Sequence, residues 1–180
     1  QTYPIEINQR NHMHDRHPDK SARQHPGGAR PELSVVVPVC NEAENIDPLH
    51  QRLTDTLREY GKSFEVVFID DGSTDQSFER LKELYDRDTS VKVIQFARNF
   101  GQQMAVSAGL QYARGNVVVL IDADLQNSPE EIPILVDKLT EGYDIVYGVR
   151  KRRVGSVVRR LGSWFTSHLI WRVTGIDLPD

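Results

Sequence analysis

The chain has 180 residues, 38% of them hydrophobic and 27% charged, which is ordinary for a globular protein and allows a full hydrophobic core. The net charge of −4 argues against nucleic acid as a partner. The single cysteine, Cys40, excludes an internal disulfide within this sequence, suits a reducing compartment and is not expected to be a nucleophile. Because no apolar run reaches about 18 residues and the N-terminus lacks an apolar core, we expect neither a membrane span nor a signal peptide here.

Residues 1–31 differ from the rest of the chain in composition. They are rich in His, Arg, Pro, Gln and Gly, and they include His12, His14, His17 and His25. Because these residues include too few apolar groups to drive folding, we predict a disordered or loosely attached tail. For its histidines, we favour a solvated tail over a weak metal site. Residues 32–180 are predicted to form one domain. The ending Leu178-Pro179-Asp180 suggests a domain cut short before a C-terminal membrane region.

From residue 33 onward, short β-branched runs alternate with segments of helical periodicity. We predict strands at residues 33–38, 64–69, 91–96, 117–121 and 143–147. This alternation, with short links, predicts an α/β fold whose mostly parallel sheet carries helices on both faces.

Four helices are predicted between these strands. The first follows an apolar pattern through Leu49, Leu53 and Leu57 and ends at Gly61. The second begins at a Thr74-Asp75 cap, and the third spans residues 102–112. The fourth begins at residues 128–131, where a serine cap is followed by proline and two acids, and ends near Gly142.

Polar residues follow four of the predicted strands, in clusters at 38–45, 70–75, 98–102 and 122–126. All strands of a parallel sheet end at the same edge, which is where open α/β proteins bind ligands. Each cluster by itself is also compatible with an ordinary turn or helix cap. Together they predict a binding site at this edge.

Two carboxylates directly follow the fourth predicted strand. The apolar run at 118–121 stops at Asp122, and Asp124 comes after one intervening residue. Neighbouring carboxylates repel each other unless a cation lies between them or one is protonated. A divalent ion with oxygen ligands, Mg²⁺ or Mn²⁺, bridging to a substrate phosphate is the simplest solution.

Common nucleotide-binding and hydrolase signatures do not occur in the sequence. The first strand is not followed by Gly-x-Gly-x-x-Gly, and neither Gly-x-x-x-x-Gly-Lys-Ser/Thr nor Gly-x-Ser-x-Gly is found. The remaining candidates are carboxylates: Asp70 or Asp71 can accept hydrogen bonds from a base or a ribose hydroxyl, while Asp122 and Asp124 hold a diphosphate through a metal. We therefore predict a nucleotide site neutralised by an ion.

Four motifs, in this order and spacing, resemble glycosyltransferase family 2. They are Pro38-x-x-Asn41-Glu42-x-x-Asn45, Asp70-Asp71-Gly72-Ser73-Thr74-Asp75, Arg98-Asn99-Phe100-Gly101-Gln102-Gln103 and Asp122-Ala123-Asp124-Leu125-Gln126-Asn127-Ser128-Pro129-Glu130-Glu131. Within the family the sequence is most similar to the polyprenyl-phosphate sugar transferases, such as dolichol-phosphate mannose synthases and the undecaprenyl-phosphate glucosyl and aminoarabinose transferases.

The resemblance implies a GT-A fold and a nucleotide-sugar donor carrying UDP or GDP. It assigns donor binding to Pro38, Glu42, Asp70, Asp71, Arg98, Asp122 and Ala123, and the metal, Mg²⁺ or Mn²⁺, to Asp122, Asp124 and Gln126. The implied reaction is inverting: a lipid phosphate oxygen attacks the anomeric carbon as the nucleoside diphosphate leaves. Since a phosphate is already an anion, no strong general base is needed.

The segment after the fifth predicted strand is basic. No acidic residue lies between Asp144 and Asp177, whereas the segment contains Arg150, Lys151, Arg152, Arg153, Arg159, Arg160 and Arg172. The resemblance implies that Arg150 acts in catalysis with Asp122 and Asp124 and that Arg150, Arg159 and Ser163 bind the acceptor phosphate. An apolar helical face at 156–173 predicts contact with an anionic membrane; packing on its own domain is the alternative.

We therefore expect a transferase at the cytoplasmic face of a membrane, anchored by a segment outside this sequence. Its expected partners are a nucleotide sugar, a polyprenyl phosphate and the membrane surface; a homo-oligomer stays open. Alternatives are a family 2 enzyme with a hydroxyl acceptor, a non-catalytic domain that binds nucleotide sugars, and a nucleotidyltransferase. The last is disfavoured because Asn41, Glu42 and Glu44 occupy the first loop, where a basic glycine-rich loop is expected.

Overall fold

The computed structural model describes residues 30–148. Residues 30–146 belong to one unit, which contains every helix and strand of the described range. Apart from residues 30 and 31, the predicted tail lies outside this range, as do Arg150, Arg159 and Ser163, so these predictions stay predictions. No helix in the described range combines the length and apolar character that crossing a bilayer requires.

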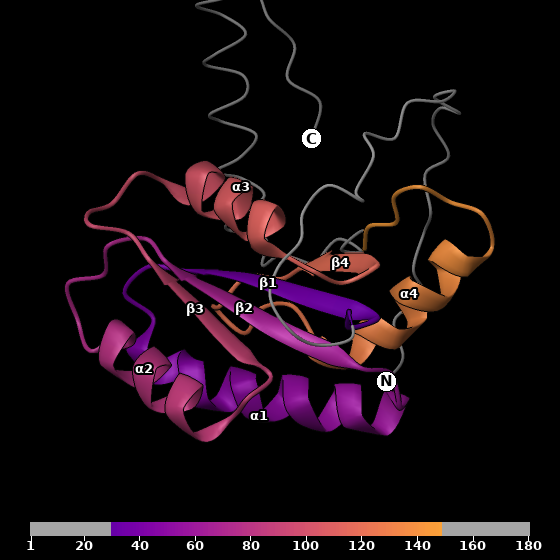
Figure 1. Cartoon of the computed structure of the whole chain (residues 1–180), viewed down its shortest axis with the longest axis horizontal. Coiled ribbons are helices and arrows are strands. Elements are labelled where there is room, and N and C mark those ends of the chain that lie inside the picture. Colours follow the sequence, from indigo (N-terminus) through magenta and orange to yellow (C-terminus); the bar gives the residue numbers. More distant parts are fainter. Residues whose placement is uncertain (1–29, 149–180) are drawn as a thin grey trace, which may run out of the picture. The chain divides into compact units, whose positions relative to one another are not determined.

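Strands and helices alternate along the described chain (Figure 1). In order they are β1 (Leu33–Val39), α1 (Ala43–Tyr60), β2 (Phe64–Asp70), α2 (Ser77–Arg87), β3 (Val91–Gln95), α3 (Gln102–Tyr112), β4 (Val117–Leu120), the 3-10 helix η2 (Pro129–Glu131) and α4 (Ile132–Thr140). The first four predicted strands and the four predicted helices are thus confirmed.

The strands form a parallel sheet in the order β3-β2-β1-β4. Every residue of the central strand β1 is buried, as expected for a continuous apolar strand covered on both faces. Val39 of β1 pairs with Asp70 of β2, which pairs with Gln95 of β3, so these three strands end level with one another. The chain runs outward from β1 to β3 and then crosses to β4 on the other side of β1. This reversal creates a topological switch point between β1 and β4.

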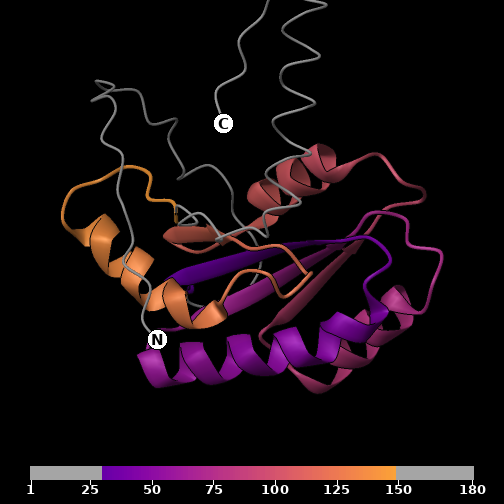
Figure 2. The same ribbon diagram turned by 180° about the vertical axis from the view of Figure 1, so that it is seen from behind.

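Helices cover both faces of the sheet, as predicted. Figures 1 and 2 show α1 and α2 against one face and α3 against the other. The larger core cluster joins Phe68 of the sheet to Leu53 of α1, Leu81 of α2 and Ile132 of α4, whereas a smaller cluster packs Ala105 of α3 on the opposite face.

The position of α3 depends on Gly109. A Cβ atom there would lie 2.3 Å from Cγ1 of Val36 and 2.8 Å from Cδ1 of Ile69. Only glycine allows the helix to approach the sheet this closely. The start of α3, at Gln102, is thereby held over the edge where the strands end.

Helix ends agree with the sequence except at the start of α2 and at Ser128, which occupies the N-cap position of η2 but makes no side-chain cap hydrogen bond. Gly61 ends α1 in the left-handed conformation, with φ of 75°, as its position predicted. The predicted cap at Thr74-Asp75 is wrong: α2 begins at Ser77 after Gln76, which makes no side-chain cap. Asp75 instead accepts the Ser77 amide with Oδ1 at 2.9 Å and the Ala43 amide with Oδ2 at 3.2 Å. Because the Asp75 carboxylate also binds the first residue of α1, α2 begins at Ser77, two residues after Asp75.

The fifth predicted strand, at 143–147, is wrong. Residues 143–148 have no regular secondary structure, and Ile145 is 80% exposed. A strand requires a hydrogen-bonded neighbour, and within the described residues β4 pairs only with β1. Alternating apolar residues favour an extended chain here but do not supply that neighbour.

Candidate functional site

A cavity of about 340 Å³ opens at the switch point between β1 and β4. Its walls come from the carboxyl ends of the strands and the loops that follow them. The lining residues are Pro38, Val39, Cys40, Glu42, Asp71, Asn99, Gly101, Gln102, Asp122, Ala123 and Asp124. The structure therefore brings four sequence motifs together at one site.

The loop after β1 is fastened to the loop after β2. Asn41 adopts the left-handed conformation, with φ of 57°, which asparagine tolerates. Its side-chain Oδ1 accepts a hydrogen bond from the Thr74 backbone amide at 2.8 Å. Its backbone amide donates a hydrogen bond to Oγ of Ser73 at 3.0 Å. Further along, the Glu42 amide donates to the buried Ser77 hydroxyl at 2.9 Å. These bonds hold Glu42 at the cavity wall.

Asp75 reinforces the same junction. Burial favours its neutral form, but the hydrogen bonds from Ser77 and from the Ala43 amide outweigh this and lower the pKa of Asp75 below its usual value. The carboxylate therefore stays ionised and keeps the starts of α1 and α2 together.

Asp70 and Asp71 have different positions although they are neighbours. Asp70 is fully buried and does not line the cavity; its Oδ1 accepts the Ser73 amide at 3.2 Å, and its Oδ2 has no hydrogen-bond partner among the described residues. Asp71 lines the cavity and is 3% exposed. Its two oxygens accept the amides of Phe100 at 2.7 Å and Gly101 at 2.9 Å. Asp71 thus anchors the loop between β3 and α3.

Gly72 allows that loop to lie against the turn after β2. Its φ is +65°, and a Cβ atom on it would lie 2.3 Å from the Arg98 carbonyl carbon and 2.4 Å from the Asn99 nitrogen. A side chain would therefore push the loop away from Asp71.

The loop itself is ordered by side-chain contacts. The Arg98 guanidinium lies 4.1 Å from the centre of the Phe100 ring, which packs edge-on against Phe96 at 5.6 Å. The Asn99 amide donates to Sγ of Cys40 at 3.2 Å. Arg98, predicted to bind the donor, does not line the cavity.

The paired carboxylates lie at the end of β4. Asp122 Oδ1 accepts a hydrogen bond from Nε2 of Gln102 at 2.8 Å. Asp124 Oδ1 accepts one from the Gln126 backbone amide at 2.9 Å. Leu125, which follows Asp124, has φ of 58°, a strained conformation for a large side chain, while it packs against the core. Gln126, predicted to bind metal through its side chain, does not line the cavity.

Asp122 and Asp124 suit a magnesium or manganese ion that is shared with a substrate. Within residues 30–148, no group of three or more His, Cys, Asp or Glu side chains is placed to hold a metal. Each of the two carboxylates, however, keeps Oδ2 free of hydrogen bonds to the described residues. Mg²⁺ is usually held by one or two carboxylates and completes its shell with substrate phosphates and water. The donor set therefore fits a metal that arrives with a diphosphate.

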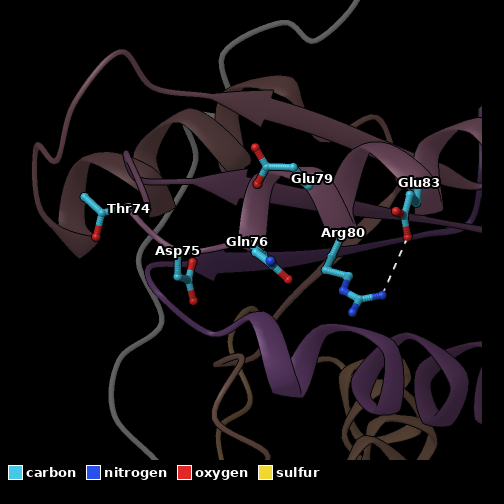
Figure 3. Close-up of a pocket in the computed structure, with 6 residues that line it drawn as sticks. All are labelled: Thr74, Asp75, Gln76, Glu79, Arg80 and Glu83. Carbon is cyan, nitrogen blue, oxygen red and sulfur yellow. Dashed lines mark ion pairs between the residues drawn. The ribbon is translucent and has the colours of Figure 1, made fainter.

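A larger hollow, about 660 Å³, lies along α2 and shares no residue with the cavity (Figure 3). It is lined by Thr74, Asp75, Gln76, Glu79, Arg80 and Glu83. Arg80 is paired with Glu83 one helical turn away at 3.7 Å, and both side chains are solvent-exposed. Its acidic, open wall has the character of a solvated helix surface.

The sequence predicted most, but not all, of this site. Pro38, Glu42, Asp71, Asp122, Ala123 and Asp124 were predicted and line the cavity. Asn99, Gly101 and Gln102 were placed at the edge by the sequence but given no role. Two signals pointed to them: they follow β3 at the same edge of the sheet, and they belong to the Arg98–Gln103 motif of the family resemblance.

A parallel sheet covered by helices, with the Asp-x-Asp pair at the end of β4, is the arrangement expected of a GT-A fold. Among solved structures, the chain is similar to the mannosyltransferase PcManGT from Pyrobaculum calidifontis, determined in complex with GDP-Man and Mn²⁺. The match has a TM-score of 0.52 and 27% identity, and it covers 63% of this chain and 34% of that chain. The predicted GT-A fold is therefore confirmed.

Residues 34–177 match glycosyl transferase family 2, and the chain belongs to this family. It is 42% identical over 149 residues to an uncharacterized glycosyltransferase from Synechocystis, covering 82% of this chain and 47% of that protein. It is 44% identical over 149 residues to the undecaprenyl-phosphate 4-deoxy-4-formamido-L-arabinose transferase of Pectobacterium carotovorum, covering 82% of this chain and 46% of that protein. The resemblance to polyprenyl-phosphate transferases is confirmed. The chain spans about half the length of these relatives.

Proposed function

We propose that this protein transfers a sugar from a nucleotide-sugar donor to a polyprenyl phosphate, with inversion, at the cytoplasmic face of a membrane. The name of the Pectobacterium relative supports a lipid-phosphate acceptor. The family supports sugar transfer. Residues 32–180 belong, in this proposal, to the catalytic domain.

The observation that carries the proposal is the joint placement of Asp71, Asp122 and Asp124 in one switch-point cavity. Asp71 lies on the β2 side and the paired carboxylates on the β4 side. A nucleotide sugar uses both sides of such a cavity. Its base and ribose need hydrogen-bond acceptors, and its diphosphate needs a cation that carboxylates hold in place. Pro38, Glu42 and Asp71 take the nucleoside end, and Asp122 with Asp124 takes the diphosphate end.

Asp122 and Asp124 would hold the Mg²⁺ or Mn²⁺ through the oxygens that accept no hydrogen bond from residues 30–148. When bound, this ion supplies positive charge that stabilises the nucleoside diphosphate as it leaves. The Mn²⁺ and GDP-Man in the PcManGT complex support this assignment. The carboxylates hold a leaving group in this scheme and transfer no proton.

The acceptor supplies its own nucleophile. An oxygen of the lipid phosphate forms a bond to the anomeric carbon while the bond from that carbon to the diphosphate oxygen breaks, and the electron pair leaves with the diphosphate. Because the phosphate is anionic at neutral pH, the reaction needs cationic contacts rather than a base. We assign these contacts to Arg150, with Arg159 and Ser163 as further candidates, since arginine binds phosphate through two parallel hydrogen bonds.

The test is binding and transfer by the membrane-bound protein. UDP-sugars and GDP-mannose are titrated with and without Mn²⁺, and the preferred donor is then incubated with undecaprenyl phosphate or with an unphosphorylated prenol. We expect metal-dependent binding of one nucleotide and transfer to the phosphate only. A nucleotide affinity that is the same with and without Mn²⁺, or transfer to the prenol hydroxyl, contradicts the proposal.

A further inference from the structure

The start of α3 contacts the metal-binding candidates directly. Gln102 is the first residue of α3, and its Nε2 donates to Oδ1 of Asp122 at 2.8 Å. An ionised carboxylate can only accept hydrogen bonds, so the amide must present its NH₂ group to Asp122. The orientation of the Gln102 side chain follows from this chemistry.

We propose that Gln102 is a positioning residue that fixes Asp122 for the metal and diphosphate. The proposal rests on the function proposed above. By occupying Oδ1, the amide restrains the rotation of the Asp122 carboxylate and leaves Oδ2 for the ion. A restrained ligand loses less conformational freedom when the metal binds, and partners of metal ligands commonly contribute about 10- to 100-fold to metal affinity.

Gln102 suits this task because it is neutral. Asp122 and Asp124 already place two negative charges at the end of β4. A third carboxylate would add repulsion whenever no metal is bound, whereas an amide adds no charge and donates a hydrogen bond to Asp122. The amide nitrogen also has no lone pair available for the metal, so it orients the ligand without replacing it.

The backbone on both sides of Gln102 is held in place, by Asp71 before it and by the packing of α3 after it. Asp71 accepts the amides of Phe100 and Gly101, the two residues before Gln102. On the other side, α3 packs closely on the sheet through Gly109. Gln102 therefore links the nucleoside side of the cavity, through Asp71, to the diphosphate side at Asp122.

The chain contains a matched control beside it. Gln103 is the same residue type, lies in the same helical turn and is exposed, and its side chain makes no hydrogen bond to the described residues. Substitution of Gln103 changes helix propensity and surface polarity as much as substitution of Gln102 does, but it leaves Asp122 untouched.

The experiment measures Mn²⁺ affinity by the electron paramagnetic resonance signal of free Mn²⁺, at saturating UDP or GDP, for the full protein and its variants. We expect Gln102→Ala to weaken Mn²⁺ binding at least about tenfold and Gln103→Ala to match the wild type. Melting temperatures and metal-free nucleotide affinity should be the same in both variants. These two readouts separate positioning from a general loss of structure.

The variant Gln102→Glu gives a second readout. At neutral pH its carboxylate cannot donate to Asp122, so Mn²⁺ should bind more weakly than in the wild type. As the pH falls, a protonated Glu regains a donor, so the ratio of its Kd to the wild-type Kd should fall. For Gln102→Ala, which has no titrating group, that ratio should stay constant.

The outcomes distinguish this inference from the proposed function. If the wild type binds Mn²⁺ with nucleotide but Gln102→Ala matches it within about twofold, the positioning role is overturned and the proposed function stands. If Gln102→Glu binds Mn²⁺ more tightly than the wild type at neutral pH, position 102 is a ligand position, and the inference is wrong. If the wild type itself shows no nucleotide-linked Mn²⁺ binding, the proposed function fails first.

Discussion

The Asp71 carboxylate accepts the Gly101 amide at 2.9 Å, and this bond joins the end of β2 to the loop that leads into α3. The second oxygen of Asp71 accepts the neighbouring Phe100 amide at 2.7 Å. Since Asp71 is nearly fully buried, the loss of either bond leaves a backbone amide without its acceptor. Asp71 therefore shapes the cavity as well as lining it.

Asp71→Asn tests this anchoring role. The substituted amide retains one acceptor oxygen but offers an NH₂ group where the second backbone amide needs an acceptor. We expect a loss of about 1–3 kcal/mol in the free energy of unfolding. We also expect nucleotide binding to weaken about tenfold. Urea denaturation and calorimetric titration measure these effects. The control Asp86→Asn, an exposed position on α2, should change neither value; an unaltered stability in Asp71→Asn contradicts the anchoring role.

Asp124→Ala and Arg150→Ala test the proposed division between donor and acceptor. The first removes a metal-binding carboxylate, so the dependence of nucleotide affinity on Mn²⁺ should disappear. The second should spare nucleotide affinity and raise the KM for the lipid phosphate about tenfold or more, because it removes a charge-assisted contact. Equal loss of donor binding in the two variants would refute the assignment.

Gly72→Ala tests the close contact between the turn after β2 and the Arg98 backbone. Gly61→Ala serves as the matched control because Gly61 also has positive φ, of 75°, but has no atom within 4 Å of the added Cβ. We expect Gly61→Ala to cost about 1 kcal/mol for the left-handed conformation alone. Gly72→Ala should cost about 3 kcal/mol, since the backbone overlap adds to that conformational term. Equal costs in denaturant unfolding would show that the contact does not constrain the loop.

Asp88 gives a prediction about pH. Its Oδ2 lies 3.0 Å from Nε2 of His50, and its Oδ1 accepts the amide and hydroxyl of Ser90 at 2.9 and 2.6 Å. Burial favours the neutral acid, but the bonds from Ser90 and His50 prevail and lower the pKa of Asp88 below its usual 3.8. The stabilisation is therefore complete above that usual value and is lost as the pH falls through it toward the lower folded-state pKa.

The variant Asp88→Asn should remove this pH dependence. Between about pH 5 and pH 2, its free energy of unfolding should fall less steeply than that of the wild type. At neutral pH the variant should be about 1–3 kcal/mol less stable, because partners of Asp88 lose an acceptor. Asp86→Asn, two residues away and exposed, should follow the wild-type curve. Parallel curves for Asp88→Asn and the wild type would show that Asp88 is not the titrating group.

The alternation of strands and helices, and the edge at which the site forms, could be predicted from local sequence patterns. A short run rich in β-branched residues, such as β1, favours a strand covered on both faces, and the i, i+4 apolar spacing through Leu49, Leu53 and Leu57 defines the buried face of α1. Both signals are local. Because parallel strands end at one edge, the convergence of the four motifs followed from their order in the chain, and so did the family.

Which of these residues reach the cavity depends on how the strands, loops and helices pack. Asp70 and Asp71 are adjacent and chemically identical, yet Asp70, the last residue of β2, is buried away from the cavity and Asp71 lines it, because neighbouring positions at a strand end point to opposite faces. The fifth predicted strand failed for a related reason, since a strand needs a partner that its own residues cannot specify. The bond between Gln102 and Asp122 spans 20 residues, and it depends on tertiary packing, because α3 is held close against β1 and β2 through Gly109. Local patterns encode elements and edges, whereas contacts across the edge depend on how the elements pack.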